Sequence, residues 1–258
     1  MLKFDDETTK LLEIAYQGGD VTRRRRKAFD ALLLCEGDTV VDIGCGNGLL
    51  TEEIARAVGG TGGVGGVDPS EDMRAPATGR CDAFPTVQIL DGSADALPLP
   101  DGEADKAVAV QVLEYLSDIP SAVREAHRVL RPGGRFVAVD TGCKTLDWFS
   151  ENQERMRRVQ QAWDHHYTEA RVAALWPGLT RENGFAAIEV EPFTFCDVTL
   201  RPDGIAFMLM HLMSRYAAEN GHMAEAETKA WFDEQIELAD QGRFFFSLTY
   251  YRMSAIKL

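Results

Sequence analysis

The chain has 258 residues, of which 45% are hydrophobic and 26% are charged, so it can bury a sizeable core. Its formal net charge of -14 repels phosphate backbones and anionic headgroups, which argues against nucleic acids and membrane surfaces as partners. The five cysteines are dispersed and form no C-x-x-C pair, so neither a disulfide framework nor a zinc site is expected.

The first residues of the chain, MLKFDDETTK, are too acidic and too polar for a signal peptide. No apolar run in the sequence approaches the ~20 residues that are needed to cross a bilayer. Together with the dispersed cysteines, these features favour a cytoplasmic protein. No metal site is expected, and the sequence leaves the oligomeric state open.

A helical cover is expected over residues 1–37, where the basic run 23–27 reads as the polar face of an amphipathic helix. Short β-branched runs then alternate with helical patterns, which is typical of a parallel sheet covered by helices. The runs are residues 39–43, 63–67, 86–90, 106–110 and 135–139. The pattern predicts one doubly wound unit, a cofactor-binding core, over residues 38–140.

Beyond this core the alternation stops. Residues 141–172 and 197–241 are rich in polar, aromatic and methionine side chains, and we interpret them as insertions that cover the substrate. A helix is expected over 173–183, and two late strands are expected over 187–195 and 244–256. Each methionine or aromatic side chain of the insertions also fits plain core packing.

A glycine turn joins the first predicted strand to a helix within residues 40–48, VVDIGCGNG. The glycines let the backbone approach a ligand closely, and the helix start offers free N–H groups. Asp68 follows at the end of the next predicted strand, where a carboxylate can accept both hydroxyls of a ribose. Together these features predict a site for a nucleoside cofactor.

Four motifs follow one another along the core: VVDIGCGNG at 40–48, GVDPSEDM at 66–73, DGSADALPLPD at 91–101 and LRPGGRF at 130–136. In this order they resemble the class I S-adenosylmethionine (SAM)-dependent methyltransferases, in particular the group similar to ubiquinone/menaquinone-biosynthesis enzymes with a type 11 domain. The resemblance implies one α/β methyltransferase domain over residues 1–258. It also implies a Rossmann-like, doubly wound sheet of seven strands, mostly parallel with an antiparallel last strand, and helical lid insertions.

The resemblance further implies SAM as the methyl donor and S-adenosylhomocysteine (SAH) as the product. The methionine part of SAM would lie against Asp42, Gly44, Cys45 and Gly46. Asp68 would hold the ribose, and the transferred methyl would lie beside Gln111. The adenine would lie near Pro69, Met73, Ser93 and Ala94.

Two positions depart from the family's pattern. Ser93 stands where the family usually has an aspartate, so this side chain can accept a hydrogen bond but carries no charge. Pro76 and Gly79 follow Met73, where family members tend to continue a helix. These two residues predict that the helix is shortened or broken.

A sulfonium methyl is already electrophilic, so the protein's main tasks are alignment and exclusion of water, and a dedicated base need not be present. If the acceptor requires a base, we consider His166 in the first insertion and Asp140 at the end of the fifth predicted strand. Each residue also fits a structural role, as a packed histidine or as a strand-end carboxylate that accepts backbone N–H groups.

The sequence therefore predicts SAM-dependent methyl transfer to an oxygen, nitrogen or carbon atom of a small molecule by in-line displacement. It leaves the identity of the acceptor open. One alternative is a catalytically silent SAM-binding partner or sensor, because the motifs do not encode acceptor chemistry. A nicotinamide oxidoreductase is disfavoured by Asp42 and by the LRPGGRF motif, and arsenite methylation by the absence of a cysteine cluster.

Overall fold

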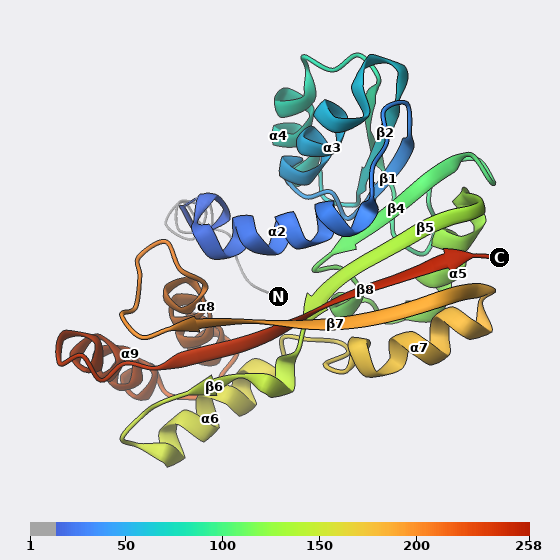
Figure 1. Cartoon of the computed structure of the whole chain (residues 1–258). Helices are drawn as coiled ribbons and strands as arrows, with labels where there is room; N and C mark the ends of the chain where they lie inside the picture. The colour runs from blue at the N-terminus through green and yellow to red at the C-terminus, as the bar shows by residue number, and fades with distance from the viewer. Residues whose placement is uncertain (1–13) are drawn as a thin grey trace. The chain divides into compact units, whose positions relative to one another are not determined.

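The computed structural model describes residues 14–258, which divide into two compact units (Figure 1). The core unit comprises Arg25–Thr141, Arg171–Phe193 and Tyr250–Leu258. The insertion unit comprises the described residues up to Arg24, together with Gly142–Ala170 and Thr194–Thr249. Helix α2 (Gly19–Leu32) and strands β7 (Phe185–Asp197) and β8 (Phe246–Lys257) continue from one unit into the other.

A mostly parallel sheet forms the centre of the core unit, with the strand order β3–β2–β1–β4–β5–β8. Its first five strands are β1 (Thr39–Ile43), β2 (Gly63–Asp68), β3 (Val87–Asp91), β4 (Ala104–Val110) and β5 (Leu130–Thr141). These five pair in parallel, whereas β8 is antiparallel to β5 and also pairs with β7. The predicted Rossmann-like sheet and its antiparallel last strand are confirmed. The carboxyl ends of the parallel strands meet at one edge, where such sheets bind ligands.

The helices of the core unit are α3 (Leu49–Val58), α4 (Glu71–Cys81), α5 (Ile119–Val129) and α7 (Val172–Glu182), with short 3₁₀ turns η1 (Gly59–Thr61) and η2 (Leu113–Tyr115). Helix α5 shows how the sequence sets its bounds. The carboxylate of Asp118 caps the helix by accepting the Ser121 backbone N–H at 2.9 Å. A buried apolar stripe follows at helical spacing and packs on the sheet: Ile119, Ala122, Val123, Ala126 and Val129.

Three large aromatic side chains pack together on one face of the sheet in the core unit. The ring of Phe136 on β5 lies 5.0 Å from Trp176 on α7 and 6.0 Å from Phe185 on β7. All three are buried, and burial of each such ring stabilises the fold by roughly 1.5–3 kcal/mol. This packing fixes α7 where the sequence predicts a helix.

The insertion unit is mainly helical, with strand β6 (Asp147–Trp148), the 3₁₀ turn η3 (Cys143–Thr145), and helices α6 (Gln153–Asp164), α8 (Ile205–Glu219) and α9 (Glu225–Asp240). Trp148 lies at the centre of its aromatic packing. The Trp148 ring lies 5.2 Å from Trp231 and 4.9 Å from Phe246, and its indole N–H donates to Gln235 at 2.9 Å. The helical character predicted for both insertions is confirmed.

The number of strands differs from the prediction. The described residues form a sheet of eight strands, so the prediction of seven is wrong. The additional strand is β6, which pairs only Asp147 and Trp148 with Ser247 and Phe246. Two residues carry no alternating pattern that the sequence can reveal, and the pairing depends on residues that are distant along the chain.

The prediction for Pro76 and Gly79 is also wrong, because α4 continues through both residues to Cys81. A proline in a helix removes one backbone donor, and packing elsewhere can offset that loss. Ala77 is fully buried, and a side chain at Gly48 would lie 2.9 Å from its Cα. Close packing against the glycine turn therefore holds the helix in place.

The basic run 23–27 is solvated only in part. Arg26 is exposed and pairs with Asp30 at 2.8 Å, as expected for a polar helix face, whereas Arg24 is buried. Arg25 lies in the core unit and pairs with Glu53 at 2.7 Å. Within the part of the chain that the structure describes, no helix is both long enough and apolar enough to span a membrane.

Candidate active site

The glycine turn after β1 contains three glycines with positive φ: Gly44 at 69°, Gly46 at 54° and Gly48 at 79°. The backbone N–H of Gly44 donates to the Val67 carbonyl at 2.7 Å, which ties the turn to β2. A side chain at Gly44 would approach Val112 to 2.4 Å, whereas one at Gly46 would meet no atom within 4 Å. Packing therefore requires glycine at position 44, and the backbone of Gly46 borders open space that a ligand can fill.

Asp68 ends β2 and links this strand to the glycine turn. Its Oδ2 accepts the Gly46 N–H at 3.0 Å, and its Oδ1 accepts the Ser70 N–H at 2.9 Å. Each carboxylate oxygen has a second lone pair, so both retain the capacity to accept a hydroxyl. The structure thus brings together the two residues that the sequence assigned to the methionine part and the ribose of the cofactor.

Asp42 lies on β1 beneath the turn and is almost completely buried. Its Oδ2 accepts the Thr51 hydroxyl at 2.7 Å, which anchors α3 to the strand. Burial raises the pKa of Asp42 to about 6, the Thr51 hydrogen bond opposes this rise, and the charge of Asp68 adds to it. Asp42 therefore titrates close to neutral pH.

Cys45, in the same turn, is a buried thiol. Burial raises its pKa above the ordinary value, and the charges of Asp42 and Asp68 raise it further. The thiol therefore stays protonated at neutral pH, which disfavours a thiolate role for Cys45. Among the described residues, no group of three or more His, Cys, Asp or Glu side chains is arranged to hold a metal ion.

The residues assigned to the adenine lie on the two segments that follow β2 and β3. Pro69 is exposed, and Met73 is half-buried in the first turn of α4. Ser93 is half-buried and donates its hydroxyl to the carboxylate of Asp95, while Ala94 is buried. Asp95 thus provides a carboxylate two residues after position 93, where the family usually has an aspartate.

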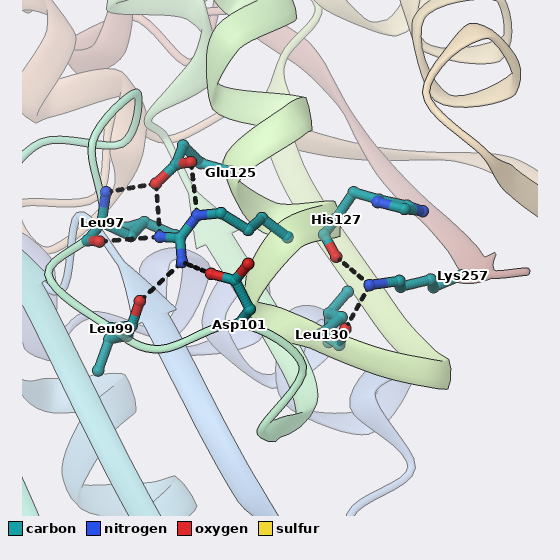
Figure 2. A network of polar contacts seen from close by, with 8 residues as sticks. Leu97, Leu99, Asp101, Glu125, His127, Leu130 and Lys257 are labelled. Carbon is teal, nitrogen blue, oxygen red and sulfur yellow. Dashed lines mark hydrogen bonds and ion pairs between the residues drawn. The ribbon is translucent and has the colours of Figure 1, made fainter.

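Arg128 of α5 holds the far end of the loop that carries Ser93 and Ala94. Its guanidinium donates to the carbonyls of Leu97 at 3.0 Å and Leu99 at 2.8 Å. It also donates to Asp101 at 2.6 Å and pairs with Glu125. Figure 2 shows Leu97, Leu99, Asp101 and Glu125 around the guanidinium. In the same view, the ammonium of Lys257 caps the end of α5 by donating to the carbonyls of His127 and Leu130. No sequence motif indicates this network, because its members come from distant segments of the chain.

Gln111 directly follows β4 and has a positive φ of 57°. Its backbone N–H donates to the Val139 carbonyl at 2.8 Å, which keeps the residue beside β5. Its side-chain Nε2 donates to Glu114 Oε1 at 2.5 Å and to Thr141 Oγ1 at 2.6 Å. The amide is therefore fixed by the buried carboxylate of Glu114, which no sequence motif indicates.

Asp140 is the next-to-last residue of β5 and is 1% exposed, while Glu114 on η2 is 0% exposed. Asp140 Oδ1 accepts the backbone N–H groups of Val112 at 3.2 Å and Glu114 at 3.4 Å. In return, Glu114 Oε2 accepts the backbone N–H of Thr141 at 2.7 Å. Burial and the charge of Glu114 raise the pKa of Asp140 well above its ordinary value. Two buried carboxyl groups therefore join the ends of β4 and β5.

His166, the other residue considered for proton transfer, belongs to the insertion unit. Its ring stacks on Trp163 at 4.2 Å and lies 5.5 Å from Tyr216. Burial lowers the pKa of His166 to about 4, so the imidazole is neutral at pH 7. Asp140 and the ten residues assigned to the cofactor all lie in the core unit.

A protein-family model described as a methyltransferase domain matches residues 41–138 of the chain. An uncharacterized 37.1 kDa protein in transposon TN4556 of Streptomyces fradiae is 31% identical over 254 residues, which cover 95% of this chain and 70% of that protein. A 2-phytyl-1,4-naphtoquinone methyltransferase of Thermosynechococcus vestitus is 34% identical over 158 residues, covering 60% of this chain and 70% of that enzyme. Other quinone methyltransferases are matched over 53% of their length.

Solved structures share the fold at lower identity. A putative methyltransferase from Bacillus halodurans has a TM-score of 0.64 and 19% identity, with 90% of this chain and 98% of that chain covered. Geranyl diphosphate C-methyltransferase from Streptomyces coelicolor, solved with Mg²⁺, geranyl-S-thiolodiphosphate and SAH, has a TM-score of 0.58 and 20% identity, with coverages of 92% and 76%. These solved structures support the fold of the chain. The sequence relatives, which are more similar in sequence, support its membership of a family.

Proposed function

Because the chain belongs to the class I SAM-dependent methyltransferases of the ubiquinone/menaquinone-biosynthesis type, we propose that it methylates a small-molecule acceptor by in-line displacement. The observation that carries the proposal is the hydrogen bond from the Gly46 N–H to Asp68, next to open space beside Gly46. This arrangement leaves room against the backbone and a carboxylate for a ribose, as a SAM site requires.

The proposed SAM site follows the residues of the core unit. Asp42, Gly44, Cys45 and Gly46 are proposed to surround the methionine part, and Asp68 to accept the ribose hydroxyls. Pro69, Met73, Ser93 and Ala94 are proposed to border the adenine, and Gln111 to lie beside the methyl group. An ionised Asp42 would also attract the positively charged ammonium of the methionine part.

When bound, SAM supplies an electrophilic methyl on a sulfonium, and its transfer leaves SAH as the product. The protein's own contribution is to hold the acceptor in line with that methyl and to keep water away. Alignment of this kind lowers a barrier by as much as ~7–11 kcal/mol in well-oriented systems, so the proposal does not depend on a dedicated base. We assign the cover over the acceptor to residues 141–172 and 197–241, within one methyltransferase domain over 1–258.

Two residues are proposed for acid–base roles with an acceptor that releases a proton, and the released proton goes to His166 alone. His166 is the base, because its lowered pKa of about 4 leaves the imidazole neutral and able to take up a proton at pH 7. Asp140 is the proton-bearing group, because burial raises its pKa.

The acceptor is proposed to be a small organic molecule. Relatives of the chain are named as quinone methyltransferases, and a structural neighbour is named for geranyl diphosphate. These names suggest which compounds to test first: reduced naphthoquinones, other phenols and prenyl diphosphates.

The experiment is to incubate the protein with SAM and each of these compounds, and to quantify SAH and the methylated product by mass spectrometry. The proposal predicts SAH formed in equal amount to one methylated product, and loss of both in an Asp68→Ala variant. Asp82→Ala, which removes an exposed carboxylate beyond the end of α4, serves as the matched control. Binding of SAH without product from these compounds or from a metabolite extract would instead favour a silent SAM-binding partner.

A further inference from the structure

The 3₁₀ turn η2, which follows β4, carries a buried carboxylate, Glu114, that the proposed SAM site does not use. We propose that Glu114 is a positioning residue for methyl transfer, which orients the Gln111 amide and leaves Asp140 as the protonated member of a buried carboxyl pair. The inference deepens the proposed function, because Gln111 is the residue assigned to the transferred methyl.

The two carboxyl groups are unequally supplied with hydrogen-bond donors. Glu114 accepts the Thr141 N–H at 2.7 Å, the Gln111 Nε2 at 2.5 Å and the Thr141 hydroxyl at 3.2 Å. Asp140 accepts two longer bonds at Oδ1, with the backbone N–H of Leu113 as a weaker third contact, and its buried Oδ2 has no hydrogen-bond partner among the described residues. Since hydrogen bonds stabilise the ionised form, the negative charge resides on Glu114 and the proton on Asp140 Oδ2.

Strand β8, which pairs with β5, places no positively charged side chain directly opposite Asp140 that could balance a negative charge there. The β8 residue opposite Asp140 is Tyr251, and the next residue, Arg252, lies opposite Val139. The guanidinium of Arg252 is engaged by Glu191 at 2.5 Å and Glu189 at 3.3 Å. A second buried negative charge would therefore be costly, which agrees with the raised pKa of Asp140.

The orientation of the Gln111 amide follows from the same contacts. Its NH₂ group is directed to Glu114 and Thr141, so the carbonyl branch of the planar amide is turned away from both. An amide carbonyl accepts hydrogen bonds.

Glu114→Gln tests the positioning role. A glutamine offers one acceptor oxygen where Glu114 offers two, so either the Thr141 N–H or the Gln111 amide loses its partner. We expect kcat to fall about tenfold while the KM for SAM stays within about threefold, a split that a general loss of stability does not produce. Glu103→Gln, at an exposed position outside the pair, should leave both constants unchanged. A kcat of Glu114→Gln within twofold of wild type would overturn the proposal.

Asp140→Asn tests whether the proton resides on Asp140, and this test needs no methyl acceptor. A group whose folded pKa is raised contributes stability that is complete below its unfolded pKa of about 3.9 and is lost as the pH rises through the folded value. We expect the melting temperature of wild type to fall more steeply from pH 5 to pH 8 than that of Asp140→Asn. Asp42 contributes equally in both proteins. Identical slopes would contradict the proposal, and this comparison stays decisive even if no methylated product is ever found.

Discussion

The backbone N–H of Gly46 donates a 3.0 Å hydrogen bond to Oδ2 of Asp68. This contact joins the glycine turn after β1 to the end of β2, two segments that are separate in the sequence. It fixes the turn in the conformation that leaves open space beside Gly46.

Alanine at Gly44 and at Gly46 should have different effects. Gly44→Ala places a methyl group against Val112 and should destabilise the fold by about 2–4 kcal/mol, since it combines backbone strain with overpacking. Gly46→Ala should cost only about 1–2 kcal/mol of stability, from its positive φ, but should weaken SAH binding about tenfold. Thermal unfolding and calorimetric titration measure the two effects.

Gly102→Ala is the matched control, because Gly102 has a φ of 69° and a side chain there meets no atom within 4 Å. It should share the backbone cost of Gly46→Ala and keep wild-type affinity for SAH. Equal affinity of wild type and Gly46→Ala would show that the space beside Gly46 is not part of the SAM site.

The affinity for SAM should depend on pH through Asp42, whose pKa is about 6. In the proposed site the ionised carboxylate attracts the ammonium of the methionine part, so affinity should rise as the pH increases from 5 to 7.5. Asp42→Asn should bind more weakly at pH 7.5 and show little change with pH. Calorimetric titrations across this range test the prediction, and an affinity that falls with rising pH would contradict the placement of Asp42.

Arg128 should stabilise the loop that is proposed to border the adenine. Arg128→Lys keeps the charge but loses the forked donor geometry that reaches Leu97, Leu99 and Glu125 together. We expect a loss of about 1–3 kcal/mol in the free energy of unfolding, measured by denaturant titration. Arg124→Lys on the exposed side of α5 is the control and should change stability by less than about 0.5 kcal/mol.

His166 should make the fold less stable in acid. Its pKa is lowered to about 4 by burial, so the unfolded chain binds more protons than the folded one between about pH 4 and pH 6.5. The stability contribution is therefore complete above pH 6.5 and is lost as the pH falls toward 4. His166→Gln should reduce the drop in melting temperature across this window, whereas the exposed neighbour His165→Gln should not. An imidazole NMR titration of His166 with a midpoint near 6.5 would contradict this account.

The core of the fold was predictable because its signals are local. The β-branched runs recur between helical patterns, and each of the five parallel strands appears where a run was found. Strand β6 was not predictable, since two residues are too few to show the alternation of apolar and polar side chains that marks a strand. The continuity of α4 through Pro76 was missed because it depends on packing of Ala77 against Gly48, a contact between distant segments.

The residues of the candidate site likewise fall into those that the sequence predicts and those that only the structure shows. Asp42, Gly44, Gly46 and Asp68 follow from strand ends and glycine spacing, which are visible in the sequence. Glu114 was missed because a glutamate just after a strand is indistinguishable by pattern from a solvated loop residue. Only the structure shows that it is fully buried between the ends of β4 and β5 and bonded to Thr141 and Gln111.

Calorimetric titration of the purified protein with SAM, SAH and NAD(H), alongside an Asp68→Ala variant, tests the central claim most directly. We predict micromolar dissociation constants for SAM and SAH, at least tenfold weaker binding in Asp68→Ala, and no heat of binding with NAD(H). Preference for NAD(H), or SAM binding that is unchanged in Asp68→Ala, would contradict the account.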